Sequence, residues 1–452
     1  MKKAIVILIT IGCLSITDRA NAQKKILTFQ DAIKIAMKNS YSLNQQKNNL
    51  TYSEMQRTSA FAGLGPSLSI NAAAQQVNGN YFNANEGRVI NGVTDRAGGS
   101  VSAGINLFNG LSQVNRARSA SSSLEAQSYY VNRTAQDVIS SISAQYLIVL
   151  LDGELLKISH ENFEVLKKQL EQVKTQVELG SKSPVDEYNQ DSQTKAAEIK
   201  MIQAEITQIN DKALLTQILL MDPNEEFDVA KPDWDINAAG NEENELQTLF
   251  DLALKNRGDY LRSKKLEEAS KYAMKSSWAG MTPTLSAFAN LGSGYNHSHG
   301  DINSRPFDVQ FKTDNLYKNY GLQLYIPVFG GNQLLQNRTA FVQQKVNYQN
   351  SQLLSKNIEI QVKSDVLRTY QNFKLYKKTF GVSIAQLKSA DIAFGYEKER
   401  YELGVTSFVD FIQANKTLVQ AQTDRAQAEY RLLFQKILMD YSLGTLKPED
   451  LD

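Results

Sequence analysis

The sequence is poor in cysteine, histidine and proline. It contains one cysteine and three histidines among 452 residues, which argues against a large metal site or a thiol-based mechanism. Basic and acidic residues number 49 and 48, so the basic excess of a charge-driven nucleic-acid-binding protein is absent. No apolar run approaches the roughly 18 residues of a membrane-spanning helix. The alternating strands of a membrane β-barrel remain possible, because they leave hydropathy low.

The N-terminus has the features of a secretory signal peptide. Lys2 and Lys3 are basic, residues 4–11 are apolar, and an A-x-A pattern ends at Ala22. We expect residues 1–22 to be removed, and with them Cys13, the only cysteine of the sequence. A partial lipoprotein-like site around Cys13 leaves lipidation of this residue as the alternative.

The two halves of the chain repeat one plan at an offset of about 220 residues, as expected of an internal duplication. Residues 61–68 (FAGLGPSL) match 278–285 (WAGMTPTL), and residues 178–186 (ELGSKSPVD) match 402–410 (ELGVTSFVD). These matches predict a first structural repeat over 23–222 (helix, two strands, long helix, helix), an irregular linker over 223–244, a second structural repeat over 245–446 and a C-terminal tail over 447–452.

Long helices are predicted where proline is missing. No proline lies between Pro66 and Pro184 or between Pro327 and Pro448. Residues 110–178 would form one helix of roughly 100 Å at 1.5 Å per residue. Apolar residues follow a 3-4-3-4 spacing typical of coiled-coil seams, at Phe163, Leu166, Leu170, Val173 and Val177, and again at Ile199, Ile202, Ile206, Ile209 and Ala213. An ordinary helical bundle with several breaks would need more proline and glycine.

Four segments of about ten residues alternate apolar with small or polar residues, which suits strands between lipid and water. The apolar positions include Leu68 and Ile70, Val101 and Ile105, Leu285 and Leu291, and Leu322 and Leu324. A soluble hairpin lying on the helices is the alternative. The polar stretches 78–99 and 293–319 are expected to be surface loops. Four strands cannot close a membrane barrel, so several chains would have to share it.

The mature sequence resembles the TolC-type outer-membrane efflux proteins. The resemblance is carried by the duplicated plan, by residues 401–410 (YELGVTSFVD), by residues 428–430 (AEY) and by residues 443–446 (LGTL). It implies a mainly α-helical chain with a membrane β-barrel portion. Each chain would contribute four strands to a trimeric twelve-stranded barrel, and long coiled-coil hairpins would form a periplasmic tunnel.

The resemblance also implies a function and partners. The chain would be a homotrimeric channel in the outer membrane that extends into the periplasm. It would act as the exit duct of a tripartite efflux or type I secretion system. Its partners would be a periplasmic adaptor (membrane fusion) protein, an inner-membrane pump of RND or ABC type, and outer-membrane lipid, with no nucleic acid. No enzymatic activity, cofactor or metal is expected. A periplasmic coiled-coil scaffold or adaptor without a channel is the alternative.

The two E-L-G turns are candidate docking tips for the adaptor. Gly180 and Gly404 end predicted helices, where glycine readily adopts the left-handed conformation. Ser183 and Ser407 can cap the next helices. The predicted tip residues are Leu179, Gly180, Ser183, Leu403, Gly404, Thr406 and Ser407. The plainer interpretation is that these residues only build helix-hairpin turns.

Asp186 and Asp410 are candidates for a pore constriction. Each lies six residues after its glycine, in a first helical turn, where the helix dipole alone favours a carboxylate. Asp410 matches the first acid of the family's aspartate motif. A second acid and an arginine of the family's best-known member are replaced here by Gln413 and Thr406, so a double acidic ring is not expected.

Two histidines and an aspartate form a possible metal-binding cluster, His297, His299 and Asp301. All three lie in a predicted polar loop without a second ligand pair, so a solvated loop is the preferred interpretation. The sequence contains no phosphate-binding glycine loop, nucleophile elbow or paired-histidine zinc motif. Enzymatic function is therefore the weakest hypothesis.

Overall fold

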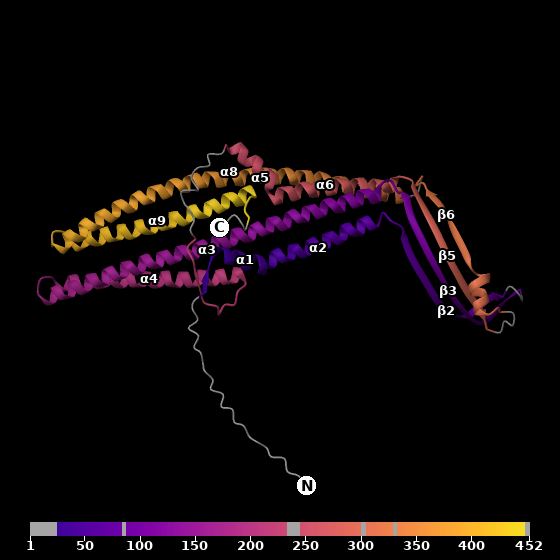
Figure 1. Cartoon of the computed structure of the whole chain (residues 1–452), viewed down its shortest axis with the longest axis horizontal. Helices are drawn as coiled ribbons and strands as arrows, with labels where there is room; N and C mark the ends of the chain where they lie inside the picture. Colours follow the sequence, from indigo (N-terminus) through magenta and orange to yellow (C-terminus); the bar gives the residue numbers. More distant parts are fainter. Residues whose placement is uncertain (1–24, 84–86, 233–244, 300–303, 329–331, 448–452) are drawn as a thin grey trace, which may run out of the picture.

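The computed structural model describes residues 25–83, 87–232, 245–299, 304–328 and 332–447. The predicted signal peptide, Cys13 and Asp301 lie outside the described residues. The described chain is an elongated body of long helices with a four-stranded sheet at one end (Figure 1). The helices run nearly parallel from the sheet to two helical hairpin ends on the opposite side.

The described elements follow one another in the same order in both halves of the chain. The first half contains β1 (Lys25–Leu27), α1 (Phe29–Asn39), α2 (Tyr41–Ala62), β2 (Ser67–Asn83), β3 (Arg88–Phe108), α3 (Ser112–Glu178), α4 (Pro184–Leu219) and β4 (Phe227–Val229). The second half contains α5 (Leu246–Asn256), α6 (Gly258–Trp278), η2 (Ala279–Met281), β5 (Thr284–Ser298), α7 (Phe307–Val309), η3 (Gln310–Asp314), β6 (Tyr317–Tyr325), α8 (Asn332–Glu402) and α9 (Phe408–Leu443). The short strand β4 lies within the stretch that was predicted to be irregular.

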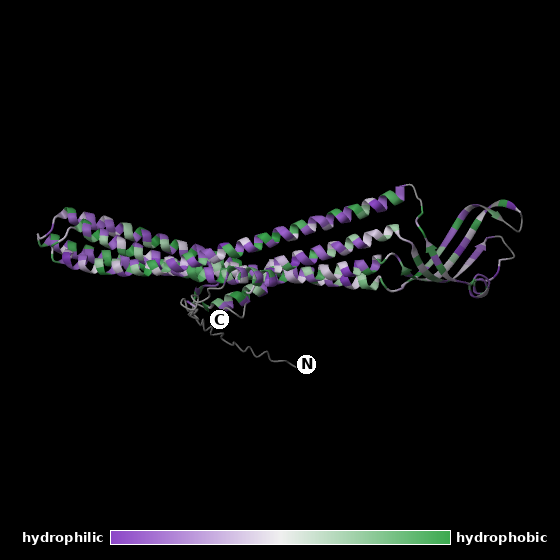
Figure 2. Ribbon diagram, turned by 90° about the horizontal axis from the view of Figure 1, so that it is seen from above, coloured by the Kyte–Doolittle hydropathy of each residue, from purple (hydrophilic) through white to green (hydrophobic). Residues whose placement is uncertain are grey.

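The long helices are confirmed. Helix α3 has 67 residues and α8 has 71, and neither is interrupted. One 18-residue window of α3 is apolar enough to cross a membrane, contrary to expectation, but 56% of it is buried inside the protein. Its hydropathy is therefore explained by the core that α3 crosses. Elsewhere hydrophobic and hydrophilic residues are interleaved along the helices (Figure 2).

The main core lies where both halves of the chain meet around α3. Apolar residues of α1, α3, α4 and α9 pack there against the parallel strands β1 and β4. Tyr146 of α3 is fully buried, and its hydroxyl lies 2.8 Å from the carbonyl oxygen of Leu27 and 2.7 Å from that of Ala230. This contact ties the small sheet to the long helix.

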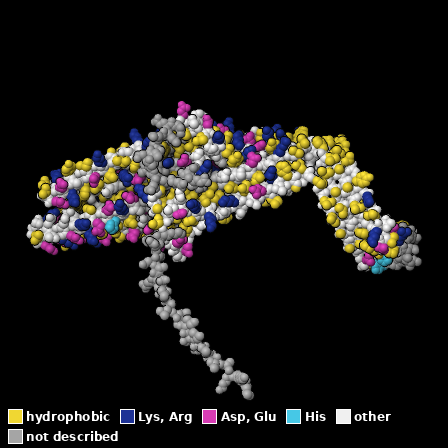
Figure 3. Space-filling model, in the orientation of Figure 1, with side chains coloured by type: hydrophobic (Ala, Val, Ile, Leu, Met, Phe, Trp, Pro, Cys, Tyr) yellow, Lys and Arg dark blue, Asp and Glu magenta, His cyan; other side chains and the backbone are white. Residues whose placement is uncertain are grey.

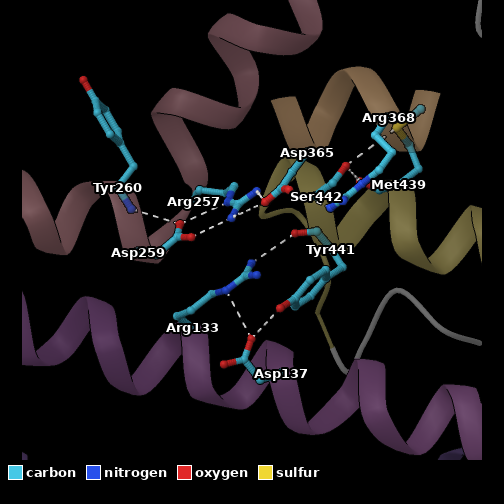
Figure 4. A network of polar contacts seen from close by, with 10 residues as sticks. All are labelled: Arg133, Asp137, Arg257, Asp259, Tyr260, Asp365, Arg368, Met439, Tyr441 and Ser442. Atoms are coloured by element: carbon cyan, nitrogen blue, oxygen red, sulfur yellow. Dashed lines mark hydrogen bonds and ion pairs between the residues drawn. The ribbon is translucent and has the colours of Figure 1, made fainter. Parts of the chain in front are cut away.

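A buried ionic network joins four helices beside this core (Figure 4). Arg257, between α5 and α6, forms ion pairs with Asp259 of α6 at 2.6 Å and with Asp365 of α8 at 3.2 Å. Arg133 of α3 donates to the carbonyl oxygen of Tyr441 in α9 at 3.2 Å. Because Arg257 and Arg133 are buried, removing their acidic partners would leave uncompensated positive charge inside the protein.

Gly444 brings the end of α9 close to this network. It caps α9 with φ 73°, in the left-handed region that favours glycine. A Cβ at this position would lie 2.8 Å from the backbone nitrogen of Arg257, which is too close for a real contact. Glycine is therefore required here for both conformation and space.

The sheet is antiparallel in the order β2-β3-β5-β6. Paired residues share a face, so the register separates two surfaces. One face is apolar and carries Leu68, Ile70, Val101, Ala103, Leu291, Ala289 and Leu322; the other carries Ser69, Asn71, Ser100, Ser102, Asn290 and Asn319. Hydrophobic side chains cover much of the sheet surface that Figure 3 shows. The outer edges of β2 and β6 have no strand partner among the described residues.

The predicted loop over 78–99 is largely strand, so this expectation was wrong, whereas only the two ends of the predicted loop over 293–319 are strand. The pairing of β2 with β3 continues from Asn78 opposite Val93 to Asn83 opposite Arg88. Strand β5 extends to Ser298 and includes His297. Strands β2, β3 and β5 have 17, 21 and 15 residues rather than about ten. Asparagine and glycine were interpreted as turn residues, but pairing with a neighbouring strand satisfies backbone groups whatever the side chains are.

The two predicted seams differ in burial. Leu166, Leu170 and Val173 are buried between helices of the same chain. Ile199, Ile202, Ile206 and Ile209 are 57%, 45%, 53% and 58% exposed. The second seam therefore has no partner within the described chain, although its spacing is that of a helix contact.

Candidate functional site at the hairpin tips

The two helical hairpins end in turns of the same design. Gly180 follows α3 with φ 73°, and Gly404 follows α8 with φ 71°. Each turn is closed by a backbone bond to the preceding helix, from Ser181 to the carbonyl oxygen of Gln176 and from Val405 to that of Arg400, both 2.8 Å. No atom lies within 4 Å of a Cβ placed on either glycine. The glycines are therefore needed for conformation alone.

Serine caps begin the second helix of each hairpin, as predicted. The Ser183 hydroxyl accepts a hydrogen bond from the Val185 amide at 3.3 Å, and Asp186 accepts one from the Ser183 amide, also at 3.3 Å. The Ser407 hydroxyl accepts one from the Asp410 amide at 3.2 Å. Both predicted aspartates therefore take part in helix capping.

The tips present apolar side chains to solvent. Leu179 and Leu403 are 78% and 79% exposed, and they occupy equivalent places in the two turns. Val185, Val405 and Val409 are also exposed. Hydrophobic residues gathered at the end of a helical hairpin are typical of a surface that another protein covers.

The Asp410 carboxylate is fully ionised at neutral pH in this setting. It accepts hydrogen bonds from the hydroxyls of Ser407 at 2.7 Å and Thr406 at 3.3 Å. The Ser407 bond is the main cause that holds the pKa of Asp410 below its ordinary value. Thr406 also bonds to Glu397 of α8, and with Gln413 these residues line an open groove between α8 and α9. A role of Asp410 or Asp186 in a pore constriction stays a prediction.

A contact between the two hairpins was not predicted. Lys182, in the first turn, donates from Nζ to the hydroxyl of Tyr401 at the end of α8, at 2.7 Å. The same Nζ lies 4.2 Å from the Tyr401 ring centroid, within cation–π range. Tyr401 is buried and stacks on Phe411 of α9 with ring centroids 4.8 Å apart. The lysine thus links the first hairpin to the aromatic core of the second.

The two histidines of the possible metal-binding cluster contact other residues, and Asp301 lies outside the described residues. His297 Nδ1 lies 2.7 Å from the Ser304 hydroxyl, and His299 Nε2 lies 2.8 Å from Asp95 Oδ2 of β3. Among the residues that the structure describes, no group of three or more histidine, cysteine or acidic residues could hold a metal ion.

Comparison with known proteins finds one family model and several similar outer-membrane proteins. A family model described as "Outer membrane efflux protein" matches residues 249–445. The chain is 21% identical to outer membrane protein TolC of Escherichia coli (strain K12), in an alignment covering 100% of this chain and 88% of that protein. The crystal structure of outer membrane protein VceC from Vibrio cholerae matches with a TM-score of 0.79 at 15% identity, covering 92% of this chain and 96% of that chain. The Campylobacter jejuni CmeC outer membrane channel matches with a TM-score of 0.75 at 18% identity, covering 93% and 88%.

The fold and the sequence comparisons therefore agree over nearly the whole chain. The two-faced sheet, the uninterrupted helices and the paired glycine turns are found together in one chain that matches these proteins over most of their length. The chain is similar in sequence to TolC-type outer-membrane efflux proteins, and it shares its fold with outer membrane protein VceC.

Proposed function

We propose that this protein is an outer-membrane channel that serves as the exit duct of a tripartite efflux or type I secretion system. The observation that carries the proposal is the sheet. It has one apolar and one polar face, its two edges have no strand partner among the described residues, and it is followed in the chain by helices of 67 and 71 residues. The protein lies in the outer membrane and extends into the periplasm.

The apolar face of the sheet has the height of a bilayer core. The part of β3 that carries this face next to the helices extends from Ala97 to Phe108. At about 3.3 Å per residue and a tilt of about 40°, these residues rise about 28 Å. Lipid-facing bands of outer-membrane barrels are about 25 Å tall.

The open edges favour a shared barrel. In lipid each backbone polar group needs a partner, so β2 and β6 must pair with strands of other copies. Three copies would give twelve strands. The exposed seam of α4 at Ile199, Ile202, Ile206 and Ile209 supports the same homotrimer, because it needs a helical neighbour.

The helices would then surround a periplasmic tunnel that ends at the hairpin tips. We propose that the exposed tip residues, Leu179 and Leu403 foremost, contact a periplasmic adaptor protein. The adaptor would connect the duct to an inner-membrane pump of RND or ABC type. Asp410, and to a smaller degree Asp186, would narrow the periplasmic end. Homologues of this chain are channels rather than enzymes, and we propose the same here.

A periplasmic scaffold without a channel is not favoured. A scaffold would have no use for a sheet that separates apolar from polar residues over its whole width. Release of the protein with soluble periplasm on cell fractionation would contradict the channel.

Native mass spectrometry and planar bilayers test the assembly. The protein in mild detergent is expected to be a trimer and to conduct ions after reconstitution. Ile206→Asp introduces a charge into the exposed seam and should dissociate the trimer. Thr207→Asp, on the same helix but off the seam, is the matched control and should leave the trimer intact. A wild-type monomer with its strand content preserved would refute the proposal.

A further inference from the structure

The connection between β5 and β6 folds back onto the sheet. Its described part includes residues 304–316, with α7 and η3. The carbonyl oxygen of Phe311 accepts a hydrogen bond from the Ser293 hydroxyl, and the Phe311 ring lies 3.8 Å from a Cβ placed on Gly99 of β3. The Phe307 ring packs edge-on against Tyr295, with centroids 5.1 Å apart.

This connection covers a gap in the sheet. Strand β6 begins at Tyr317, opposite Gly292, so the last part of β5 lacks a strand on that side. Gln310 replaces the missing strand: its Nε2 donates to the Asn296 carbonyl oxygen and its Oε1 accepts from the Asn296 amide, both at 3.1 Å. Asn315 Nδ2 donates to the Gly294 carbonyl oxygen at 2.7 Å. Gln310 is only 8% exposed, so the connection is fixed in place.

The register shows which face the connection covers. Ser293 pairs with Gly99, Tyr295 with Ala97 and His297 with Asp95. These positions are separated by even numbers of residues from Leu291 and Val101, so all of them belong to the apolar face. The connection therefore lies on the side of the sheet that faces lipid in the proposed channel, and not over the polar side.

The residues on this face change character with height, as a membrane does. The aliphatic band ends at Leu291, which is paired with Lys318 of β6, and is followed by the rings of Tyr295, Phe307 and Phe311. Beyond them lies a polar layer in which Asp95 contacts His299 and Gln76. Figure 3 shows charged and histidine side chains gathered at this far end of the sheet. Aromatic residues between an apolar band and a polar layer are typical of the membrane interface.

We propose that residues 304–316 form a membrane-interface anchor that lies on the lipid-facing side of the barrel and inserts Phe307 and Leu316 among outer-leaflet lipids. Phe307 is 51% exposed and Leu316 is 46% exposed, although both lie on a fixed segment. Two basic and two acidic residues leave the segment without net charge: Arg305, Lys312, Asp308 and Asp314. Arg305 is paired with Asp314 at 3.0 Å. The segment therefore binds lipid at the boundary between acyl chains and headgroups. It binds through apolar contact rather than through attraction to anionic headgroups.

Spin labelling tests the anchor, which rests on the proposed membrane location. The mature chain is expected to lack cysteine, so single-cysteine variants can carry a nitroxide whose collisions with oxygen and with a water-soluble nickel complex report depth. Phe307→Cys in reconstituted vesicles should collide severalfold less with nickel than Asn319→Cys, which lies on the polar face of β6. Lys312→Cys is a second label site that keeps Phe307 and Phe311 in place, in case Phe307→Cys disturbs the packing. Its label should also report a depth at the membrane interface. High salt should change neither value.

Tyr320→Cys, on the apolar face of β6, separates the two proposals. If its label lies in lipid while the labels at 307 and 312 collide with nickel as freely as that at 319, the anchor is wrong and the channel stands. Labels at 307 and 312 shielded from both reagents would place the segment against a neighbouring copy and would also overturn the anchor. A Tyr320→Cys label in water would overturn both.

Discussion

Asp152 connects protonation with stability in the helical body. It lies on α3, is 7% exposed and faces Asp211 of α4. Gln145 donates to the carbonyl oxygen and Oδ1 of Asp211 at 3.0 and 3.1 Å. Asp152 Oδ2 is buried and has no hydrogen-bond partner within the described part of the chain. Burial, followed by the hydrogen bond and charge of Asp211, raises the pKa of Asp152 to about 7.

This shift has a definite sign. A rise from 3.8 to about 7 is about three pKa units, or about 4 kcal/mol. The native state binds the proton more tightly than the unfolded state, so stability falls as pH rises from about 4 to about 7 and is flat above that. The ionised carboxylate therefore destabilises the fold at pH 8, and about a third of that penalty is present at pH 5. Asp152→Asn introduces a hydrogen-bond donor without a charge, so it should remove this destabilisation.

Thermal unfolding of the purified protein in detergent measures this effect. The midpoint of Asp152→Asn should exceed that of the wild type by several degrees at pH 8 and by clearly less at pH 5. Asp211→Asn is the matched control. It removes the neighbouring charge but not the burial, so it should weaken the pH dependence without abolishing it. An equal shift of Asp152→Asn at both pH values would refute the reasoning.

Three further predictions concern the tips. Gly404→Val should introduce about 1–2 kcal/mol of local strain, because valine is disfavoured in the left-handed conformation. It should lower cargo export while the trimer yield on native gels stays normal. An equal loss of export and of trimer yield would mean that the glycine is merely structural. Asp410→Ala should weaken cation selectivity and block by multivalent cations in planar bilayers, and Asp186→Ala should do less; unchanged selectivity would leave Asp410 as a capping residue. Lys182→Met should remove an interaction with Tyr401 worth about 1–2 kcal/mol and should raise the resting conductance in planar bilayers. Lys174→Met, at an exposed lysine, is the control and should leave the conductance unchanged. Unaltered conductance of Lys182→Met would mean that the contact with Tyr401 does not restrain the tip.

Local features of the fold could be predicted from the sequence. The turns at Gly180 and Gly404 and the caps at Ser183 and Ser407 depend on residues within one helical turn, so their spacing was sufficient. The uninterrupted α3 followed from missing proline, a requirement that also acts locally.

Contacts between distant segments could not be predicted in the same way. The Lys182–Tyr401 link joins residues 219 positions apart, and no periodicity connects them. Strand lengths were underestimated because pairing partners, rather than the asparagines and glycines near Asn78, decide where a strand ends. The spacing of the seam at Ile206 predicted a helix contact, but spacing does not say whether the partner is in the same chain.

The length of α3 and the absence of breaks in it allow a tilt at one end to displace the other end. The helix spans about 100 Å without a proline or a gap in its hydrogen bonding, and its first third packs against α6 while its far end carries the Gly180 turn. Such a helix has no proline at which it could kink sharply, so we expect a tilt at one end to be carried along its length. A tilt of about 5° about the sheet end would displace the far end by about 9 Å, given the length of the helix. Small adjustments near the membrane would therefore be amplified into an aperture change at the opposite end, without remodelling of any turn.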